Sequence, residues 1–281
     1  MSNQYRTSNS KGLINKDKVI NFTFNGDSYQ GYEGDTLASA LIANGIHLVG
    51  RSFKYHRPRG FLGAGVEEPN AMVQLHEGDR SEPNIMATEV ELVEGLKAKS
   101  QNCWPSVKFD IGEINNILNR FFPAGFYYKT FMWPASFWEK YEFFIRHSAG
   151  LGKSPTSSDP DIYDHRNVHC DVLVVGAGIS GIMAAKNAAK NNFKTLLVDE
   201  KNELGGSTVY ENNEFNKINN KTSSEWLKKE IEELKNIKNL EIKTRTSVAA
   251  YHQYNYLLAR ENLTDHLEAK DKTNKMFYNT T

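Results

Sequence analysis

A glycine-rich segment carries the clearest chemical signal in this sequence. It reads Gly176-Ala177-Gly178-Ile-Ser180-Gly181, which is the pattern G-x-G-x-x-G. In such a segment the first glycine permits a tight turn, the second lets the main chain approach a diphosphate, and the third lets a helix pack closely on a strand. A helix that begins there directs its free N–H groups and the positive end of its dipole at the phosphates.

An acidic pair follows at the distance that the dinucleotide-binding fingerprint requires. Asp199 and Glu200 come about twenty residues after the glycines, at the end of an apolar run. A carboxylate there accepts hydrogen bonds from the adenosine ribose, and we assign this role to Glu200, with Asp199 beside it. Its charge repels a 2′-phosphate, which favours NAD over NADP, and Lys201 weakens that exclusion. The following segment, Glu203-Leu-Gly-Gly206-Ser207, resembles the second glycine pair of the flavoproteins with two dinucleotide domains, and Ser207 could donate to a phosphate.

The elements around the motif have the order of a Rossmann-type βαβ unit. An apolar strand precedes the glycines, an alanine-rich helix follows them, and a second apolar strand leads to the acidic pair. A charged amphipathic helix, with Ser223 as its expected cap, and a third strand at 240–248 come next, followed by a possible hairpin. This order predicts an α/β domain over 168–281. It would bind the ADP half of NAD or, alternatively, of FAD, because both cofactors contain that half.

Residues 17–103 have a different pattern, which predicts a small β-grasp domain. An alternating strand runs into Asn25-Gly26, a hairpin signal, and a second strand returns. Asp35 is placed to cap the helix that follows, and Gly45 ends that helix. Further short strands are expected near residues 71–75 and 88–97.

A loop in this region has the form of an iron–sulfur loop without its ligands. The stretch PRGFLGAGVEEPNAMV can be aligned with the plant-type spacing C-x4-C-x2-C, and the ligand positions then hold Leu62, Glu67 and Asn70. The chain has 2 cysteines, Cys103 and Cys170, which cannot supply a four-thiolate site. We expect a ferredoxin-like β-grasp with no iron–sulfur cluster. A β-grasp unrelated to ferredoxins is the alternative, and it also predicts no iron.

Aromatic residues are concentrated between the two predicted domains, and a stretch rich in Ser, Pro and Asp at 151–167 marks a domain boundary. Such a density is typical of a packed connector or of a subunit interface, and both interpretations stay open. The chain is thus divided into an N-terminal arm (1–16), a β-grasp domain (17–103), an aromatic-rich connector (104–167) and a Rossmann-type domain (168–281). The predicted fold class is α+β followed by α/β.

Composition excludes several other classes of function. The 281 residues include 34 basic and 34 acidic side chains, so no net field attracts nucleic acid or an anionic membrane. Apolar runs fall far short of the ~20 residues of a membrane span, and the polar N-terminus has no secretory signal core. We expect a cytoplasmic protein with no nucleic-acid or membrane partner. No set of side chains predicts a catalytic or metal site, and His165, His169 and Cys170 are interpreted as a linker that enters a strand.

Longer segments resemble the α subunit of heterotetrameric sarcosine oxidase. They are GRSFKYHRPRG, EEPNAMV, SQNCWPS, AGFYYKTFMWP, IRHSAGLG, CDVLVVGAGISG, VDEK and ELGGS, and the similarity covers nearly all of 15–265. Subunits of octopine, hydroxyproline and cyanide-forming dehydrogenases share this plan. Many of those keep the cluster cysteines, which this chain lacks, so the sarcosine branch is favoured.

The resemblance implies an activity, cofactors and partners. In that family a complex of α, β, γ and δ subunits oxidises sarcosine to glycine and hydrogen peroxide and, with tetrahydrofolate, forms 5,10-methylenetetrahydrofolate. FAD on the β subunit oxidises the amine, FMN near the α–β contact receives the electrons, and the α subunit holds NAD. The NAD contacts implied here are the glycine loop with Ser180, then Asp199, Glu200, Lys201 and Ser207, and an adenine contact near Val248.

The family chain is much longer than this one, so we expect a fragment or a truncated gene product. It would lack the folate-binding domain, have an incomplete Rossmann-type domain at its C-terminal end, and have no complete active site. Two alternatives remain open. One is an FAD-binding subunit of a related amine, opine or hydroxyproline dehydrogenase, and the other is a non-catalytic scaffold subunit.

Overall fold

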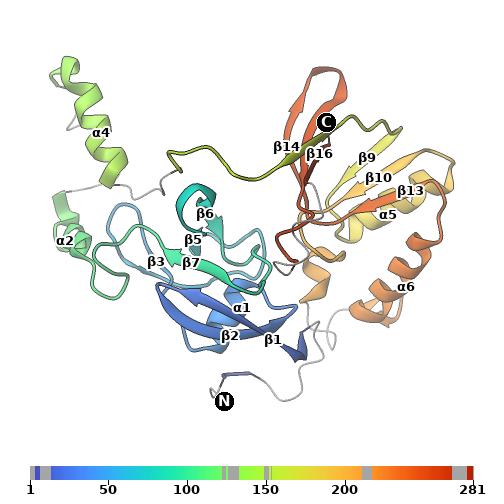
Figure 1. The fold of residues 1–281 in the computed structure, drawn as a ribbon, viewed down its shortest axis with the longest axis horizontal. Helices are drawn as coiled ribbons and strands as arrows, with labels where there is room; N and C mark the ends of the chain where they lie inside the picture. The colour runs from blue at the N-terminus through green and yellow to red at the C-terminus, as the bar shows by residue number, and fades with distance from the viewer. Residues whose placement is uncertain are drawn as a thin grey trace. The chain divides into compact units, whose positions relative to one another are not determined.

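The computed structural model describes residues 4–6, 14–121, 125, 133–148, 152, 154–210, 217–267 and, for the backbone alone, 277–280. Two compact units divide the chain: Met1–Ser10 with Ile14–Pro160, and Lys11–Leu13 with Asp161–Thr281. We call them the N-terminal unit and the C-terminal unit (Figure 1). Each unit has its own cluster of buried apolar side chains. Much of the predicted arm at 1–16 lies outside the described residues.

The N-terminal unit is built on a mixed sheet with the strand order β2-β1-β7-β5-β6. Its strands are β1 (Asn15–Phe24), β2 (Asp27–Glu33), β5 (Met72–Leu75), β6 (Glu82–Met86) and β7 (Leu96–Ser100). β1 pairs antiparallel with β2 and parallel with β7. Helix α1 (Leu37–Ala43) buries Leu37 and Leu41 in one core with Phe22 and Val73 of the sheet. A mixed sheet with one packed helix agrees with the predicted β-grasp fold.

Two predicted local features lie near the start of this unit: a hairpin turn and a helix cap. The turn is where the sequence predicts it, and the cap is one residue further on. The predicted turn between β1 and β2 is confirmed, because Asn25 and Gly26 have φ of 55° and 88°, the signs of a type I′ turn. The predicted cap is wrong, since Thr36 and not Asp35 is the N-cap of α1 and its hydroxyl accepts the Ser39 N–H. Asp35 instead accepts the Ser39 hydroxyl at 2.6 Å. Both residue types cap helices, so type alone does not rank neighbours.

The strand predicted at 88–97 is largely wrong. β6 ends before it, and β7 includes only its last residues. Val90 and Leu92 do alternate into the core, but their main chain bonds to the start of α1. Val90 accepts the Leu37 N–H at 2.9 Å, and Leu92 donates to the Asp35 carbonyl at 2.9 Å. Alternating burial therefore occurs here without a long neighbouring strand.

The connector after this sheet presents apolar side chains to solvent. Trp104, Trp133 and Phe144 are 69%, 84% and 68% exposed. The connector contains η2 (Ile111–Glu113), α2 (Ile114–Ile117), η3 (Asn119–Phe121), η4 (Ala135–Phe137) and α4 (Trp138–Ser148). Shorter elements elsewhere in the unit are β3 (Gly50–Arg51), β4 (Pro58–Arg59) and η1 (Gly78–Arg80). These three side chains of the described part of the connector are therefore not covered by packing within the chain.

The C-terminal unit contains a parallel sheet with the order β13-β10-β9. Its strands and helices are β9 (Val172–Val175), α5 (Ile179–Lys190), β10 (Thr195–Val198), α6 (Ser223–Lys235) and β13 (Leu240–Lys243). Ile182 of α5, Leu197 of β10 and Trp226 of α6 share one buried cluster. A short 3-10 helix, η5 (Gly206–Val209), and the small pair β11 (Lys217–Ile218) and β12 (Lys221–Thr222) lie between β10 and α6. The predicted βαβ order around the glycines is confirmed.

The predicted third strand is divided between two sheets. β13 ends at Lys243, and Arg245 has a positive φ of 51°, which breaks the strand. The chain then enters a second sheet of order β14-β15-β16-β8. Its elements are β8 (Tyr163–Arg166), β14 (Thr246–His252), η6 (Gln253–Asn255), β15 (Tyr256–Glu261) and β16 (Phe277–Thr280). The predicted hairpin is present as β14 and β15, joined through η6.

The cap of α6 also differs from the prediction by one residue. Thr222, and not Ser223, is the N-cap, because its hydroxyl accepts the Glu225 N–H while the Glu225 carboxylate accepts the Thr222 N–H at 3.1 Å. This capping box needs a glutamate three residues after the cap. Only Thr222 of the two candidates has a glutamate at that distance.

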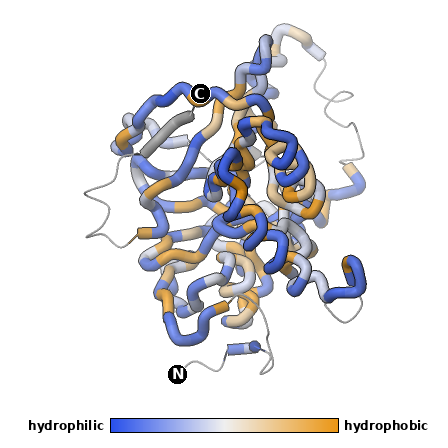
Figure 2. The backbone as a smooth tube through the Cα atoms, turned by 90° about the vertical axis from the view of Figure 1, so that its right-hand side faces the viewer, coloured by the Kyte–Doolittle hydropathy of each residue, from blue (hydrophilic) through white to orange (hydrophobic). Residues whose placement is uncertain are grey.

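Hydrophobic and hydrophilic residues are interspersed along the chain, as Figure 2 shows by colour. Among the described residues, none of the helices combines the length and the apolar character that a membrane crossing requires.

Candidate dinucleotide-binding site

The glycine segment forms the bend between strand β9 and helix α5. Gly176 has a φ of 93°, a conformation that favours glycine. Gly178 is the N-cap of α5 and provides no side-chain hydrogen bond to the first turn. Main-chain N–H groups of that turn have no partner within the helix. They and the helix dipole can therefore bind a phosphate at this end of α5.

Gly178 and Gly181 differ in what surrounds them. A Cβ at Gly181 would collide with the Gly176 carbonyl oxygen, so the helix can approach the turn only without one. A Cβ built at Gly178 meets no atom within 4 Å. The space over Gly178 is thus open, and a diphosphate could lie against its main chain. The geometry fits the dinucleotide that the motif predicts.

The second glycine pair, Gly205 and Gly206, lies against the G-x-G-x-x-G turn. The Gly205 N–H donates to the Ala177 carbonyl at 2.8 Å, and a Cβ on Gly206 would lie 3.1 Å from the Gly178 Cα. Ser207 follows directly and is exposed. The structure therefore brings Gly206 and Ser207 to the loop where the phosphates are expected.

Asp199 has a role that the sequence analysis did not identify. One of its carboxylate oxygens accepts the Ala177 N–H at 2.5 Å, and the other accepts the Lys201 N–H at 2.9 Å. The residue is only 9% exposed. Asp199 therefore fixes the glycine turn to the end of β10, and both of its carboxylate oxygens already accept main-chain N–H groups. Parallel pairing of Val175 with Val198 could have indicated this contact, because it places both strand ends together.

Glu200 remains the acidic side chain available to a ligand at the end of β10. It is exposed, unlike the neighbouring Asp199. The Lys201 ammonium lies 5.5 Å from the centre of the Tyr210 ring, a cation–π contact close to the second glycine pair. An exposed carboxylate beside a clamped glycine turn is the arrangement needed to accept hydrogen bonds from ribose hydroxyls.

Val248 is placed differently from the other predicted contacts. It lies on β14, opposite Ala259 of β15. Together with Val172, Val175 and Tyr251 it lines a hollow of about 720 Å³. No glycine of the motif lines that hollow, so an adenine contact by the Val248 side chain has no direct support from the geometry.

A 2Fe–2S cluster does not fit the ligand set of this chain. The two cysteines, Cys103 and Cys170, are free and lie in different units. Burial raises the pKa of both thiols, which disfavours the thiolate that binds iron. Among the described residues, no group of three or more His, Cys, Asp or Glu side chains could hold a metal ion.

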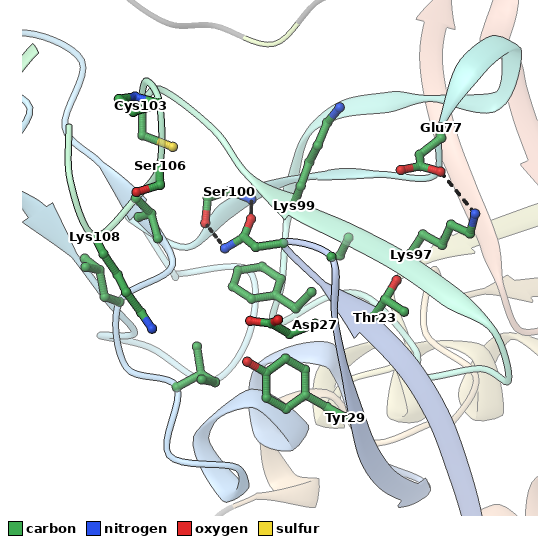
Figure 3. A pocket seen from close by; sticks show the side chains of 18 of the residues that line it. Thr23, Asp27, Tyr29, Glu77, Lys97, Lys99, Ser100, Cys103, Ser106 and Lys108 are labelled. Carbon is green, nitrogen blue, oxygen red and sulfur yellow. Dashed lines mark hydrogen bonds and ion pairs between the residues drawn. The ribbon is translucent and has the colours of Figure 1, made fainter. Parts of the chain in front are cut away.

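Cys103 instead lies beside a hollow of about 790 Å³ on the N-terminal unit, shown in Figure 3. Lys99, Lys108 and Asp27 also line it, and Lys97 there pairs with Glu77 at 3.0 Å. The charges are mixed in sign and do not converge on one point. This hollow offers no defined ligand chemistry.

Two family models match the chain, one for each unit. Residues 17–103 match a 2Fe-2S iron-sulfur cluster binding domain, and residues 171–278 match an FAD dependent oxidoreductase. Sarcosine oxidase subunit alpha from Rhizobium meliloti (strain 1021) is 48% identical over 258 residues, which are 92% of this chain and 26% of the relative. Its counterpart from Corynebacterium sp. (strain U-96) is 32% identical, over 91% of this chain and 22% of that relative.

The chain thus spans about a quarter of the length of these curated relatives. A crystal structure of L-proline dehydrogenase from P.horikoshii superimposes with a TM-score of 0.53, at 17% identity, over 100% of this chain and 41% of that one. At that identity the similarity shows a shared fold. Similarity to α subunits along most of the chain confirms the resemblance that the sequence motifs indicated.

Proposed function

We propose that this chain, a relative of sarcosine oxidase α subunits along nearly its whole length, is the dinucleotide-holding part of an oxidoreductase subunit that acts on amine donors. The observation that carries the proposal is the open space over Gly178 at the start of an uncapped helix, with the exposed Glu200 nearby. The described residues offer no catalytic set that we can assign, and in this proposal the subunit completes its chemistry within a complex.

The residues of the site have separate roles in this proposal. First-turn N–H groups of α5, including that of Ser180, bind the diphosphate, and Ser207 donates its hydroxyl to it. Gly206 keeps the second loop close enough to Gly178 for this contact. Glu200 accepts hydrogen bonds from the ribose, and the main chain near Val248 contacts the adenine. A bound nicotinamide or flavin dinucleotide would supply hydride-transfer chemistry.

NAD is the dinucleotide that we propose first, and FAD is the second candidate. An exposed acid at the end of β10 suits the unphosphorylated ribose of either one. The match of residues 171–278 to an FAD dependent oxidoreductase model favours FAD. Denaturing the purified protein and identifying the released nucleotide by mass distinguishes them. A colourless protein that releases NAD supports the first candidate, and a yellow protein that releases FAD supports the second.

The complete reaction that we propose is that of the named relatives. A complex with β, γ and δ subunits would oxidise sarcosine to glycine and peroxide and pass the one-carbon unit to tetrahydrofolate, in the cytoplasm. FAD and FMN would lie mainly on the β subunit and at the α–β contact. Co-expression of an α subunit that carries this chain with its β subunit should give sarcosine-dependent peroxide. Unchanged peroxide on omission of the α subunit would contradict the proposal.

The exposed connector is the part that we propose for subunit contact. Trp104, Trp133 and Phe144 expose large apolar area, as interface aromatics do before assembly. Replacing Trp133 with Ser should leave the unfolding temperature unchanged and weaken co-purification with the β subunit. Equal recovery of the β subunit with the unaltered protein and with Trp133→Ser would argue against a subunit contact at this connector. A scaffold subunit with an empty nucleotide site would keep co-purification and show no nucleotide binding.

The N-terminal unit is proposed to work without an iron–sulfur cluster. The sequence offers 2 cysteines, and neither lies at the aligned ligand positions Leu62, Glu67 and Asn70. Electron transfer in the proposed complex would then bypass this unit.

A further inference from the structure

We infer that the Glu68 carboxylate is a built-in anion that takes the place of the cluster in the loop at 62–71. Glu68 is 1% exposed and lies within the loop. Its two oxygens accept four main-chain N–H groups, from Leu62 at 2.5 Å, Gly63 at 2.6 Å, Asn70 at 2.7 Å and Ala71 at 3.2 Å. The inference deepens the proposed absence of a cluster and rests on that part of the proposed function alone.

The hydrogen bonds of this loop involve the three positions that align with the cluster ligands. Leu62 and Asn70, at the first and third positions, both donate their N–H groups to Glu68. Glu67, at the second position, accepts the N–H groups of Ala64 at 2.8 Å and Gly65 at 3.0 Å. The Leu62 side chain is 77% exposed and therefore faces solvent. All three positions are thus engaged in a network centred on carboxylates.

An iron–sulfur cluster and the Glu68 carboxylate would both accept hydrogen bonds from the main chain of this loop. Hydrogen bonds to sulfur stabilise an iron–sulfur cluster and tune its potential, so a loop around a cluster offers N–H donors to an anion. A carboxylate has two oxygens with about four acceptor sites, which matches the four donors here. Burial raises the pKa of Glu68, but the bonds from Gly63, Leu62, Asn70 and Ala71 lower it by more, and its net shift is downward. The carboxylate is therefore ionised at neutral pH.

The surrounding chain holds this loop in place without metal. The Thr88 hydroxyl donates to the Gly65 carbonyl at 2.9 Å, and both groups are buried. The Ala87 N–H donates to the Ala71 carbonyl at 2.9 Å, and both alanines are fully buried. We conclude that the loop folds around Glu68 and that the iron supply does not affect its stability.

Substitution with chemical rescue tests this inference in the full chain. Glu68→Ala leaves four N–H groups without an acceptor and should lower Tm by about 10 °C or more. Sodium formate at about 0.1 M should restore part of that loss, because a small carboxylate can bind the vacated donors. Pivalate at the same concentration is too bulky for the space and should not restore it. Glu67→Ala, in the neighbouring exposed glutamate, is the matched control and should show a smaller loss and no formate effect.

Several results would overturn the inference. They are an unchanged Tm for Glu68→Ala, equal effects of formate and pivalate, or a 2Fe–2S absorption spectrum with bound iron in the unaltered protein. If Glu68→Ala does not fold, hydrogen exchange decides the question in Glu68→Gln, which keeps the volume and removes one acceptor oxygen. Faster exchange at Leu62, Gly63, Asn70 and Ala71 supports the inference, and unchanged exchange overturns it. Nucleotide release tests the proposed dinucleotide site separately. A protein that released no nucleotide would leave the conclusion about Glu68 unchanged.

Discussion

The Asp199 carboxylate accepts the main-chain N–H of Ala177 at 2.5 Å, across 22 positions of sequence. This bond joins the end of β10 to the turn that follows β9. It explains why two acids stand together at the strand end. One holds the glycine loop in shape, and the exposed Glu200 stays available to a ligand.

Replacing Asp199 with Asn should loosen the glycine turn. An amide can accept one of the two N–H groups but presents its own N–H₂ to the other, so one bond is lost and a donor is left unpaired. We expect a loss of about 1–3 kcal/mol in unfolding free energy and about tenfold weaker dinucleotide binding. Urea denaturation and calorimetry measure the two effects. Full stability with unchanged affinity would show that the hydrogen bonds of the Asp199 carboxylate are dispensable.

Two glycine substitutions should separate binding from folding. Gly178→Ala adds a methyl group that meets no protein atom and occupies the space proposed for the diphosphate. We expect normal Tm and at least about tenfold weaker binding, by calorimetry. Gly181→Ala directs its methyl group at the Gly176 carbonyl and should lower Tm. The proposed site is refuted by a Gly178→Ala chain that binds as tightly as the unaltered one.

Glu200 should set the preference between NAD and NADP. Glu200→Gln removes the charge that repels a 2′-phosphate, and it weakens the acceptor for the ribose hydroxyls. We expect several-fold weaker NAD binding, a higher ratio of NADP to NAD affinity, and an unchanged Tm because the side chain is exposed. Competition titrations with both dinucleotides give the ratio. An unaltered ratio would remove Glu200 from the site.

Acid should weaken the loop around Glu68 selectively. Its pKa is lowered in the folded chain, so its contribution to stability is complete above the unfolded-state value of about 4.3 and is lost as pH falls through the folded value. The difference in unfolding free energy between the unaltered chain and Glu68→Gln should therefore shrink from about pH 5 to about pH 3. Denaturation followed by circular dichroism at each pH measures it. A constant difference over this range would contradict the assignment.

Lys186 should stabilise the contact between α5 and α6. Its ammonium lies 2.6 Å from the Glu233 carboxylate and also pairs with Glu230, and its side chain is only 12% exposed. Lys186→Met leaves the buried Glu230 without its cation and should reduce unfolding free energy by about 2–4 kcal/mol. Lys190→Met is the control, since its ammonium is 3.9 Å from Glu233 and its side chain is 58% exposed. We expect less than about 1 kcal/mol there, and equal losses in both variants would disprove the assignment.

Local patterns allowed much of this molecule to be predicted. The spacing of Gly176, Gly178 and Gly181 indicated the strand, turn and helix, because those constraints act between near neighbours. The Asn25-Gly26 turn was equally local. The helix caps at Thr36 and Thr222 were missed by one residue each, where two capping residues stand side by side.

By itself the sequence determined that a glycine turn joins a strand to a helix and that an acid ends the next strand. Only the tertiary structure decided that Asp199 bonds to Ala177, that Glu68 gathers four N–H groups, and that the run after Lys243 joins another sheet. The physical reason is that a residue type specifies which bonds it can form. Its partners depend on which strand ends and loops the fold brings together.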